Sequence, residues 1–560
     1  MGNIRFAMKA LGVLVACVLA VGSSVSASAI VADTQKTSVK ADENQPFFME
    51  NKEKNKGLMP SAYHVPGSML EPSGASLPSS YRSKITDVKN QGIYNTCWAF
   101  SNIAALESFL IKDGKGTYDL SENHLSWWST EQYNSDGYGW QFTDLDYGGY
   151  SMVGAGYLAS WQGAKLEEDF PYSSYGNSMP DNMEDGYIPY NVTGIMYVAN
   201  DITSVKTAIK NYGGVATSYS STDRFYNRDR SSYYQAEGDY CPGHAITIIG
   251  WDDDYSVDNF KEAPPADGAW LVKNSWGDST CEDGLMWISY YDPYLLDTNL
   301  WGSNVVITSA RTNSGYDRLY QDETYGATWY TYLNESDNNY LRELTFVNVF
   351  DFDQQHKYLQ KVIFETRETG VSYKAYYIPV VNGVPDAKAD NWIKLAAGKS
   401  NTSGYICVDT AGFELPSGVG AIGITVDSGD SSAYASMGVS EWLADANNNY
   451  VFFPNAHKNE SFVIHDSTVY DLMDIYAASN DKIGGTLVIK ALASEYRIGD
   501  VTGDGRSSTA DALYILRNSL GMKYFDKEQM VNADTNFDGN ITAADALRVQ
   551  RKTVGLISDY

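Results

Sequence analysis

The 560-residue sequence has few cysteines, few histidines and comparatively few basic residues. Five cysteines are too few for a disulfide scaffold in a chain of this length. Lys and Arg total 41 against 70 Asp and Glu, and the net charge of −29 argues against a nucleic-acid partner. Beyond residue 30 there is no long apolar run, so no membrane-spanning helix is predicted there. These scarcities favour an acidic protein with a self-repelling surface, long enough for two to four domains.

The first 29 residues are typical of an export signal. Arg5 and Lys9 precede the apolar stretch 11–21, and Ala27-Ser28-Ala29 offers the small residues of a cleavage site. We therefore expect a secreted protein that keeps no transmembrane anchor after residues 1–29 are removed. Residues 30–76 are polar and interrupted by prolines, which fits either an inhibitory pro-segment or a plain linker.

The most informative stretch of the chain surrounds Cys97. A polar, glycine-containing segment leads into an apolar-periodic run, which predicts a helix that starts at Cys97. A helix N-terminus favours a thiolate over a thiol, and Gln91 is close enough in sequence to donate its amide to a developing oxyanion. A single cysteine near a helix start is more often structural, so the rest of a site has to be found elsewhere.

Two later segments supply the rest of that site. The nucleophile segment resembles that of the papain family of cysteine peptidases, and two later segments resemble the family's histidine and asparagine motifs. The matching residues are Gln91-Gly92 with Cys97-Trp98-Ala99-Phe100-Ser101, then Gly243-His244-Ala245, then Lys273-Asn274-Ser275-Trp276-Gly277. His244 follows the nucleophile at the distance typical of the family, and an acidic insertion at 252–267 lengthens the distance to Asn274.

This resemblance implies a Cys–His–Asn catalytic site. Cys97 would be the nucleophile, His244 its base and then the acid for the leaving amine, and Asn274 the residue that orients His244. Gln91 and the backbone N–H of Cys97 would bind the oxyanion. Because thiol and imidazole titrate jointly, the pKa of Cys97 is expected to lie well below its free value of about 8.5.

The resemblance also implies substrate contacts. Gly148 and Gly149 would let the backbone approach a substrate peptide and pair with it. Trp276 would shield the hydrogen bond between the histidine and the asparagine, and we include it among the substrate-binding residues. Cys241 and Cys281 flank the histidine and asparagine strands, and the sequence leaves open whether they are bridged.

Residues 301–494 differ in character from the region before them. Short strand-like runs alternate with turn signals, which predicts a β-sandwich. The region loosely resembles the lectin-like domains that follow papain-like domains in some secreted bacterial proteins. Carbohydrate binding and a purely structural role both remain open. The predicted strands cover 340–349, 361–366, 372–381, 404–408, 420–426 and 485–491.

The last segment, 495–560, carries a duplicated acidic loop with a period of 34 residues. Oxygen-bearing side chains at loop positions 1, 3, 5 and 12, with Gly at position 6, suit Ca²⁺, and position 7 would ligate through its backbone carbonyl. The pattern resembles a dockerin, which binds cohesin domains of cellulosome-type scaffolds. Thr502 stands where Asp or Asn is usual, so a weaker first site is expected. The predicted ligands are Asp500, Thr502, Asp504, Arg506 and Asp511, and then Asp534, Asn536, Asp538, Asn540 and Asp545.

Together these patterns predict a multidomain protein. An α+β papain-like domain with a helical half and a β-barrel half would occupy 77–300, an all-β sandwich 301–494, and a small α-helical dockerin with two Ca²⁺ loops 495–560. We expect an extracellular cysteine endopeptidase that acts on proteins or peptides, needs no cofactor for catalysis and is held on a cohesin-bearing scaffold. Two alternatives stay open: a catalytically silent papain-like module that acts in adhesion, and a transferase or ligase with the same catalytic residues.

Overall fold

The computed structural model describes residues 67–72, 76–129, 138–142, 148–174, 179–236, 243–336, 339–429, 435–441, 443–444, 450–478 and 484–557. The predicted export signal and most of the predicted leader lie outside these ranges, as does Cys241. Within the described ranges, no helix combines the length and the apolar character needed to cross a membrane.

The papain-like region is organised around helix α2. Every residue from Trp98 to Leu110 is buried, because α2 packs against α4 on one side and against strands β7, β10 and β4 on the other. Ser121 caps α3 by accepting the His124 N–H, and Asp201 caps α5 by accepting the Ser204 N–H. The helices and 3-10 turns are α2 (Cys97–Lys112), α3 (Glu122–Trp128), α4 (Ser151–Ala159), η4 (Tyr172–Ser174), α5 (Ile202–Tyr212), η5 (Val257–Asn259) and α6 (Thr298–Trp301).

The strands of the papain-like region, except β2, form most of one long sheet of thirteen strands. Neighbouring strands run antiparallel except for β6 and β9, which are parallel. The order along this sheet is β11-β28-β16-β20-β3-β10-β4-β7-β8-β9-β6-β5, and β1 pairs with β7. The strands are β1 (Ser80–Arg82), β2 (Gly139–Phe142), β3 (Tyr190–Val198), β4 (Val215–Ser220), β5 (Tyr226–Asn227), β6 (Ser232–Tyr233), β7 (Gly243–Asp252), β8 (Ala269–Lys273), β9 (Leu285–Ser289) and β10 (Asn304–Thr312).

Strands make up most of the described part of the accessory region. A seven-stranded sheet in the order β18-β17-β21-β15-β25-β26, with β19 on β17, forms one of its layers. Its elements are β11 (Asp317–Tyr320), β12 (Trp329–Thr331), β13 (Asn334–Ser336), β14 (Asn339–Tyr340), β15 (Glu343–Phe352), β16 (Tyr358–Thr366), β17 (Val371–Val381), β18 (Val384–Pro385), η6 (Ala389–Asn391), β19 (Ile393–Ser400), β20 (Ser403–Glu414), β21 (Gly418–Asp427), β22 (Met437–Glu441), β23 (Leu443–Ala444), β24 (Tyr450–Phe453), β25 (Ser461–His465), β26 (Thr468–Asp471), α7 (Leu472–Ala478), β27 (Gly485–Leu487) and β28 (Ile489–Ser494).

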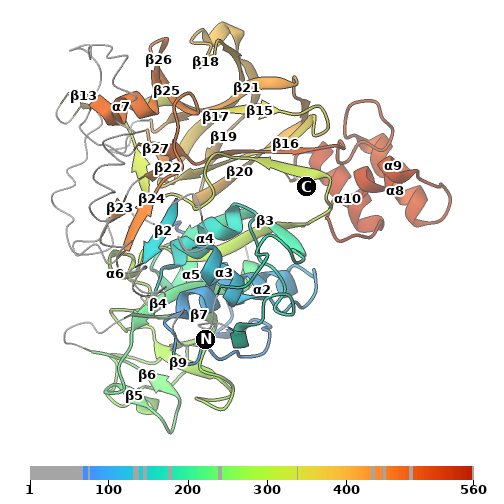
Figure 1. The fold of residues 1–560 in the computed structure, drawn as a ribbon. Helices are drawn as coiled ribbons and strands as arrows, with labels where there is room; N and C mark the ends of the chain where they lie inside the picture. The colour runs from blue at the N-terminus through green and yellow to red at the C-terminus, as the bar shows by residue number, and fades with distance from the viewer. Residues whose placement is uncertain are drawn as a thin grey trace, which may run out of the picture. The chain divides into compact units, whose positions relative to one another are not determined.

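The second layer of the accessory region continues the sheet of the papain-like region. Strand β20 pairs with β3 through Ser403↔Tyr197 to Tyr405↔Ile195, and the two strands run side by side in Figure 1. Strand β10, which begins after residue 300, pairs with β3 and β4. The two regions also share one hydrophobic core, in which Trp98 and Phe364 are both buried. No sheet boundary therefore separates them.

A buried carboxyl marks this seam between the two regions. Glu365 of β16 is fully buried, and its Oε1 accepts hydrogen bonds from the Tyr197 hydroxyl at 2.7 Å and the Tyr330 hydroxyl at 2.8 Å. Oε2 accepts the Ala327 N–H at 3.3 Å, and Tyr405 also hydrogen-bonds the carboxyl. We call these residues the seam cluster. Burial raises the pKa of Glu365, and the surrounding hydroxyls act in the opposite direction.

The C-terminal segment is helical, as predicted. Its helices are α8 (Thr509–Ser519), α9 (Lys527–Ala533) and α10 (Ala543–Thr553), and they enclose a small core that includes Ile515, Ala533 and Val549. A capping box starts α8 with Ser508 and Asp511, and another starts α10 with Thr542 and Asp545. The sequence duplication thus produces two equivalent loop-to-helix junctions.

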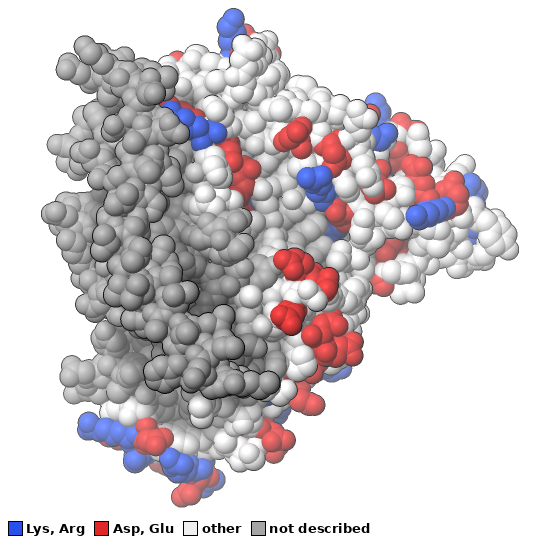
Figure 2. Space-filling view, in the orientation of Figure 1, with Lys and Arg blue, Asp and Glu red and all other residues white. Residues whose placement is uncertain are grey.

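The surface reflects the acidic composition. Figure 2 shows acidic side chains spread over the described part of one face. Basic side chains gather at the lower left of this view, in the area of β5 and β6 in Figure 1. Arg224, Arg228 and Arg230 lie along the chain around β5.

Candidate active site

Cys97 is the first residue of α2, as the sequence predicts. Its half-buried thiol is hydrogen-bonded by the backbone N–H of Ala245, the residue that follows His244 in β7. The backbone N–H groups of Cys97 and Trp98 also hydrogen-bond the sulfur. The N-terminus of α2 therefore meets the start of β7, so that two segments almost 150 residues apart in the sequence lie together at the thiol.

His244 and Asn274 come together on neighbouring antiparallel strands. His244 Nε2 lies 2.8 Å from Asn274 Oδ1, and both side chains are buried. The Ser275 N–H donates to the same Oδ1 at 2.8 Å, so this atom is the amide oxygen and His244 Nε2 carries the proton. The other ring nitrogen, Nδ1, is thereby the basic one. The Trp276 ring stacks on the imidazole, with centroids 4.7 Å apart.

Burial governs the electrostatics of this pair. It raises the pKa of the Cys97 thiol, which the three backbone N–H groups partly oppose. It lowers the pKa of His244 to about 4, against the effect of the hydrogen bond to Asn274. The raised pKa of the thiol is opposite in direction to the sequence-based expectation of a lowered one. Transfer of the thiol proton to the ring would create two opposite charges, whose attraction counteracts the cost of burying each.

Gln91 is held in one orientation beside these groups. Its Oε1 accepts the Ser275 hydroxyl at 2.5 Å, and its Nε2 donates to the Tyr94 carbonyl at 2.7 Å. A side-chain amide has two N–H donors, so one remains for a further acceptor. The Gln91 backbone N–H also donates to the Ser275 carbonyl at 2.8 Å. The loop before α2 is thus tied to the residue that follows Asn274.

Ser275 and Tyr172 were not assigned site roles from the sequence. The Tyr172 hydroxyl donates to the Gln91 carbonyl at 2.9 Å and lies 2.6 Å from the Thr96 hydroxyl, just before the nucleophile. Ser275 belongs to the segment Lys273-Asn274-Ser275-Trp276-Gly277, whose resemblance to the papain family gave a signal for it. The contacts of Tyr172 and Ser275 with Gln91 join positions 81 and 184 residues apart, which no local pattern encodes.

The two predicted substrate glycines lie against the nucleophile segment. Gly148 has a φ of +106°, which L-residues rarely adopt, and a Cβ on it would lie 3.8 Å from the Asn95 carbonyl oxygen. A Cβ on Gly149 would lie 2.5 Å from the Trp98 indole. Both positions thus need glycine, for backbone conformation and for close packing respectively.

A cavity of about 400 Å³ opens on the other side of His244. Trp276 and Tyr219 contribute to its lining, and both rings contact the imidazole, Tyr219 at 5.9 Å between centroids. Cys281 also lines this cavity as a free thiol, and its Sγ accepts a hydrogen bond from the Tyr226 hydroxyl at 3.1 Å. The proposed partner of Cys281 in a bridge, Cys241, is outside the described residues.

The first acidic loop of the C-terminal segment gathers three carboxylates. Carboxylate oxygens of Asp500, Asp504 and Asp511 lie within 4.8 Å of one another. This spacing would allow the three side chains to bind a single metal ion. Asp500 and Asp511 are buried. Buried carboxylates at this separation repel one another unless a cation lies between them, and an all-oxygen donor set fits Ca²⁺. Thr502 places its hydroxyl 3.5 Å from Asp500 Oδ1, and Arg506 offers only its backbone carbonyl.

The second loop repeats the backbone pattern with a looser set of side chains. Asp534 accepts the N–H groups of Asp538 and Gly539, and Asp545 accepts those of Thr535 and Asn536. The Asn536 amide donates to Asp538 Oδ2 at 2.8 Å, so its oxygen would have to turn toward a metal ion. Asn540 would ligate through its carbonyl. The first loop thus gathers its carboxylates more closely than the second. The weaker Ca²⁺ binding expected of the first site stays a prediction.

Two family models match the chain. The model described as papain family cysteine protease matches residues 77–294, and the dockerin type I domain matches residues 498–552. The first range contains Gln91, Cys97, His244 and Asn274, and the second contains both acidic loops.

Two solved structures of one bacterial protein match most of the chain. One shows the cysteine protease and lectin-like domains of Cwp84, a surface layer associated protein of Clostridium difficile. It is 34% identical, covers 79% of this chain and 94% of that chain, and has a TM-score of 0.68. The other shows a cysteine-to-alanine variant of Cwp84 after propeptide cleavage, with 35% identity, coverage of 74% and 100%, and a TM-score of 0.66. The fold is thus papain-like, followed by a lectin-like β-region and then by dockerin helices.

Two curated relatives match a little over a third of the chain. Macrodontain-1 from Ananas macrodontes is 29% identical over 205 residues, which are 36% of this chain and 81% of that protein. Cysteine proteinase A from Leishmania mexicana is 28% identical over 217 residues, 38% of this chain, and the chain spans only 54% of its length.

Proposed function

Because the chain belongs to the papain family of cysteine peptidases, we propose that it is an endopeptidase that hydrolyses peptide bonds through Cys97, His244 and Asn274. The observation that supports this most directly is the junction of α2 with β7 and β8. It brings a helix-terminal thiol, a histidine with a basic Nδ1 and an orienting amide together from three distant motifs.

The proposed reaction begins with proton transfer from the Cys97 thiol to His244 Nδ1. The resulting thiolate attacks the scissile carbonyl carbon, and the negative charge moves to the carbonyl oxygen. The remaining N–H of the Gln91 amide and the Cys97 backbone N–H bind that oxygen. As the C–N bond breaks, the imidazolium gives its proton to the leaving amine, and a thioester with the acyl part of the substrate remains. A water molecule, deprotonated by His244, then hydrolyses the thioester and restores the thiol.

Substrate binding is proposed for the two sides of this site. Gly148 and Gly149 lie on the side of Trp98, where their backbone groups would pair with an extended peptide. Trp276 and the cavity beside it lie on the side of His244, which hands its proton to the leaving amine. The part of the substrate that follows the cut would therefore lie along Trp276.

We infer that the leader is a pro-segment removed before activity. The relative Cwp84 is reported after propeptide cleavage, and the residues at the end of the leader in this chain are part of the folded body. Ser68 is fully buried, donates its N–H to the Tyr197 carbonyl at 2.8 Å and accepts the Ser403 N–H at 2.7 Å. Gly67 packs so closely that a Cβ would lie 2.1 Å from the Val198 carbonyl carbon. Removal of residues 30–66 would leave these contacts intact.

The dockerin would attach the enzyme to a cohesin domain of an extracellular scaffold. Two Ca²⁺ ions would be held by Asp500, Thr502, Asp504, Arg506 and Asp511 and by Asp534, Asn536, Asp538, Asn540 and Asp545, the residues in seventh position through their carbonyls. Such ions would neutralise the buried carboxylates at the start of α8 and α10. Chelation is therefore expected to loosen this domain without stopping peptide cleavage.

The test of the proposed function is cleavage of a mixed peptide library from pH 5 to 8 under reducing conditions. Wild type and a variant that begins at Gly67 are each compared with Cys97→Ala. Cys407→Ala, which removes a different cysteine thiol, on β20, is the matched control. Cleavage that disappears only with Cys97→Ala supports the peptidase. A folded protein beginning at Gly67 that neither cleaves peptides nor reacts with a thiol-directed electrophile would leave the binding-module alternative. Products joined to an added amine would indicate a transferase instead.

A further inference from the structure

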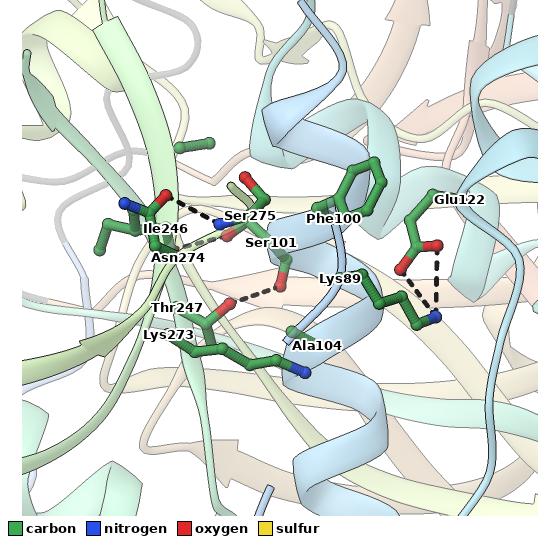
Figure 3. Close-up of a pocket in the computed structure, with 11 residues that line it drawn as sticks. Lys89, Phe100, Ser101, Ala104, Glu122, Ile246, Thr247, Lys273, Asn274 and Ser275 are labelled. Atoms are coloured by element: carbon green, nitrogen blue, oxygen red, sulfur yellow. Dashed lines mark hydrogen bonds and ion pairs between the residues drawn. The ribbon is translucent and has the colours of Figure 1, made fainter. Parts of the chain in front are cut away.

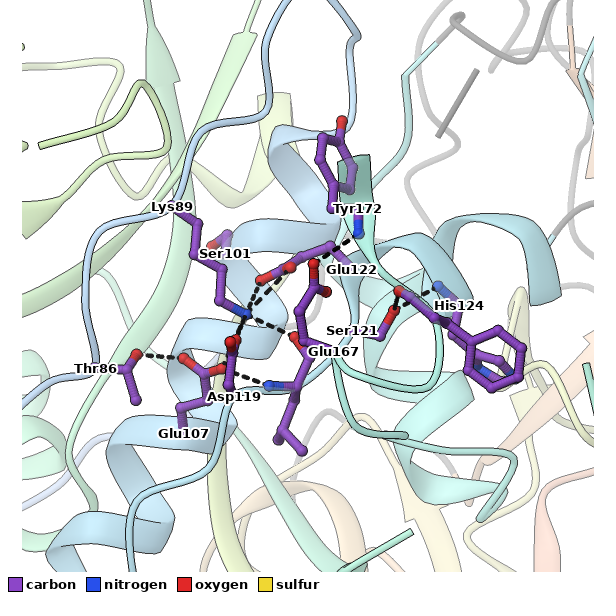
Figure 4. A network of polar contacts seen from close by, with 12 residues as sticks. Thr86, Lys89, Ser101, Glu107, Asp119, Ser121, Glu122, His124, Glu167 and Tyr172 are labelled. Atoms are coloured by element: carbon purple, nitrogen blue, oxygen red, sulfur yellow. Dashed lines mark hydrogen bonds and ion pairs between the residues drawn. The ribbon is translucent and has the colours of Figure 1, made fainter. Parts of the chain in front are cut away.

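A buried cluster of charged side chains lies behind the candidate active site. It contains two lysines, Lys89 and Lys273, and two glutamates, Glu107 and Glu122, of which all but Lys89 are at most 5% exposed. Figure 4 shows Lys89 pointing into a ring of carboxylates between α2 and α3. None of these residues has a role in the proposed chemistry, and burying four charges is costly unless they serve a purpose.

The first half of the cluster joins Lys89 to the two helices. Lys89 Nζ donates to Glu107 Oε1 of α2 at 3.2 Å and to both carboxylate oxygens of Glu122 of α3 at 3.0 and 3.2 Å. It also donates to the Leu120 carbonyl at 2.7 Å and contacts the exposed carboxylate of Asp119 at 2.7 Å. Lys89 is two residues before Gln91, so this end of the loop is anchored to the helices.

The second half joins the strand of Asn274 to the same glutamate. Lys273 Nζ donates to the Thr86 hydroxyl at 2.7 Å and lies 3.7 Å from Glu107 Oε2. The Thr86 hydroxyl in turn donates to Glu107 Oε2. Lys273 immediately precedes Asn274, so this contact lies directly beside the residue that holds His244.

Glu107 is therefore a common reference point for three parts of the site. It lies on α2, which also carries Cys97, and it binds the lysine next to Asn274 as well as the lysine near Gln91. A small cavity is lined by Lys273 of the cluster and by Asn274 of the site, as Figure 3 shows. Its volume of about 10 Å³ is enough for no more than one water molecule, so no substrate group enters between them.

We propose that Glu107 and Lys273, with Lys89 and Thr86, are positioning residues that set where Gln91 and Asn274 stand relative to Cys97. This inference rests on the proposed peptidase function. Apolar residues of similar size could fill the same space and would stabilise the fold at least as well. They would not direct two separate segments to one point on α2, because apolar contacts lack direction whereas ion pairs and hydrogen bonds have it.

The central test is the double variant Glu107→Gln/Lys273→Met, which keeps the volume and the balance of charge. On enzyme whose active sites have been titrated, kcat is expected to fall by about 100-fold while KM changes by about 2-fold or less, because the catalytic groups are displaced and substrate contacts are not. The melting temperature should be retained. Alkylation of Cys97 by a small neutral electrophile should slow most at acidic pH, since a misoriented His244 no longer supports the thiolate.

Two further variants sharpen the test. Thr86→Val removes only the hydroxyl bridge and no charge, and is expected to lower kcat about 10-fold with the same shift in the alkylation profile. Asp119→Asn is the matched control, because it removes a carboxylate from the same Lys89 on the exposed side and should leave kcat within about 2-fold.

The outcomes separate the possible explanations. Unchanged kcat and an unchanged alkylation profile in folded double and Thr86→Val variants would overturn the positioning role. So would a lower melting temperature with normal kcat per titrated site, which would make the cluster purely structural. If the double variant does not fold, Thr86→Val decides. An inactive wild-type protein would instead overturn the proposed function itself, and the positioning role with it.

Discussion

The candidate active site and the seam cluster both bury polar groups where two parts of the chain meet, but they use their hydrogen bonds differently. In the seam cluster the Glu365 carboxyl binds three tyrosine hydroxyls and a backbone N–H. In the active site His244 uses one nitrogen for Asn274 and keeps a second, basic nitrogen, and the Gln91 amide has a second donor. A cluster whose hydrogen-bonding groups all have partners stabilises the fold. A cluster that keeps a basic nitrogen and an N–H donor for the substrate can exchange protons and bind a reacting oxygen.

The largest expected effect comes from the active-site side of this comparison. His244→Ala removes the base and the acid of the proposed reaction, so kcat/KM should fall by about 10⁴-fold or more. Its free energy of unfolding should change by no more than about 2 kcal/mol, as for a partly satisfied buried side chain. Peptide kinetics and urea unfolding on the same preparation measure both quantities. A large loss of stability together with residual activity would contradict this prediction and show that His244 mainly stabilises the fold.

The seam cluster is expected to show the reverse pattern. Glu365→Ala leaves the hydroxyls of Tyr197, Tyr330 and Tyr405 buried without their acceptor, and should lower the free energy of unfolding by about 3–5 kcal/mol. The kcat per titrated active site should stay near that of the wild type, because the cluster lies on the accessory side of β3. Loss of kcat in a folded, titrated sample would contradict the comparison.

The pH dependence of stability provides a smaller and more specific test. Burial raises the pKa of Glu365 above its unfolded value of about 4.3, so the folded protein retains a proton that the unfolded chain loses as pH rises. This carboxyl therefore contributes less stability at pH 8 than at pH 5. Glu365→Gln, which imitates the protonated form, should match the wild type at pH 5 and exceed it at pH 8. The melting temperature of both proteins at the two pH values measures this, and equal slopes would disprove a raised pKa.

The smallest expected effect concerns Tyr172, which supports the active-site loop through its hydroxyl. Tyr172→Phe removes the hydroxyl that donates to the Gln91 carbonyl and contacts Thr96. A single hydrogen bond is worth about 1 kcal/mol, so kcat/KM should fall about 5-fold with little change in stability. Tyr187→Phe, at an exposed position, is the matched control. A fall in kcat/KM as large as that of His244→Ala would show that the loop depends on this one contact.

Much of the candidate site could be predicted from the sequence. The start of α2 at Cys97 follows from a change from polar to apolar-periodic residues, and the adjacency of His244 and Asn274 follows from motifs at strand ends. The six predicted accessory runs coincide with β15, β16, β17, β20, β21 and the β27–β28 segment, and the papain-like, β-sheet and helical order of the fold is confirmed. The direction of the Cys97 pKa shift was not predicted correctly, because the degree of burial depends on packing from several segments.

The sequence by itself determined which residue types stand at the site and in what order, because caps, helix periodicity and loop ligands are encoded within a few neighbouring residues. Only the tertiary structure decided that β20 joins β3, that Glu365 is enclosed by tyrosines from distant strands, and that Glu107 meets both Lys89 and Lys273. Several of these contacts join residues that are more than 150 positions apart, such as Glu365 and Tyr197 at a separation of 168. Such pairings are selected by which surfaces bury together, and that is a property of the whole packed chain.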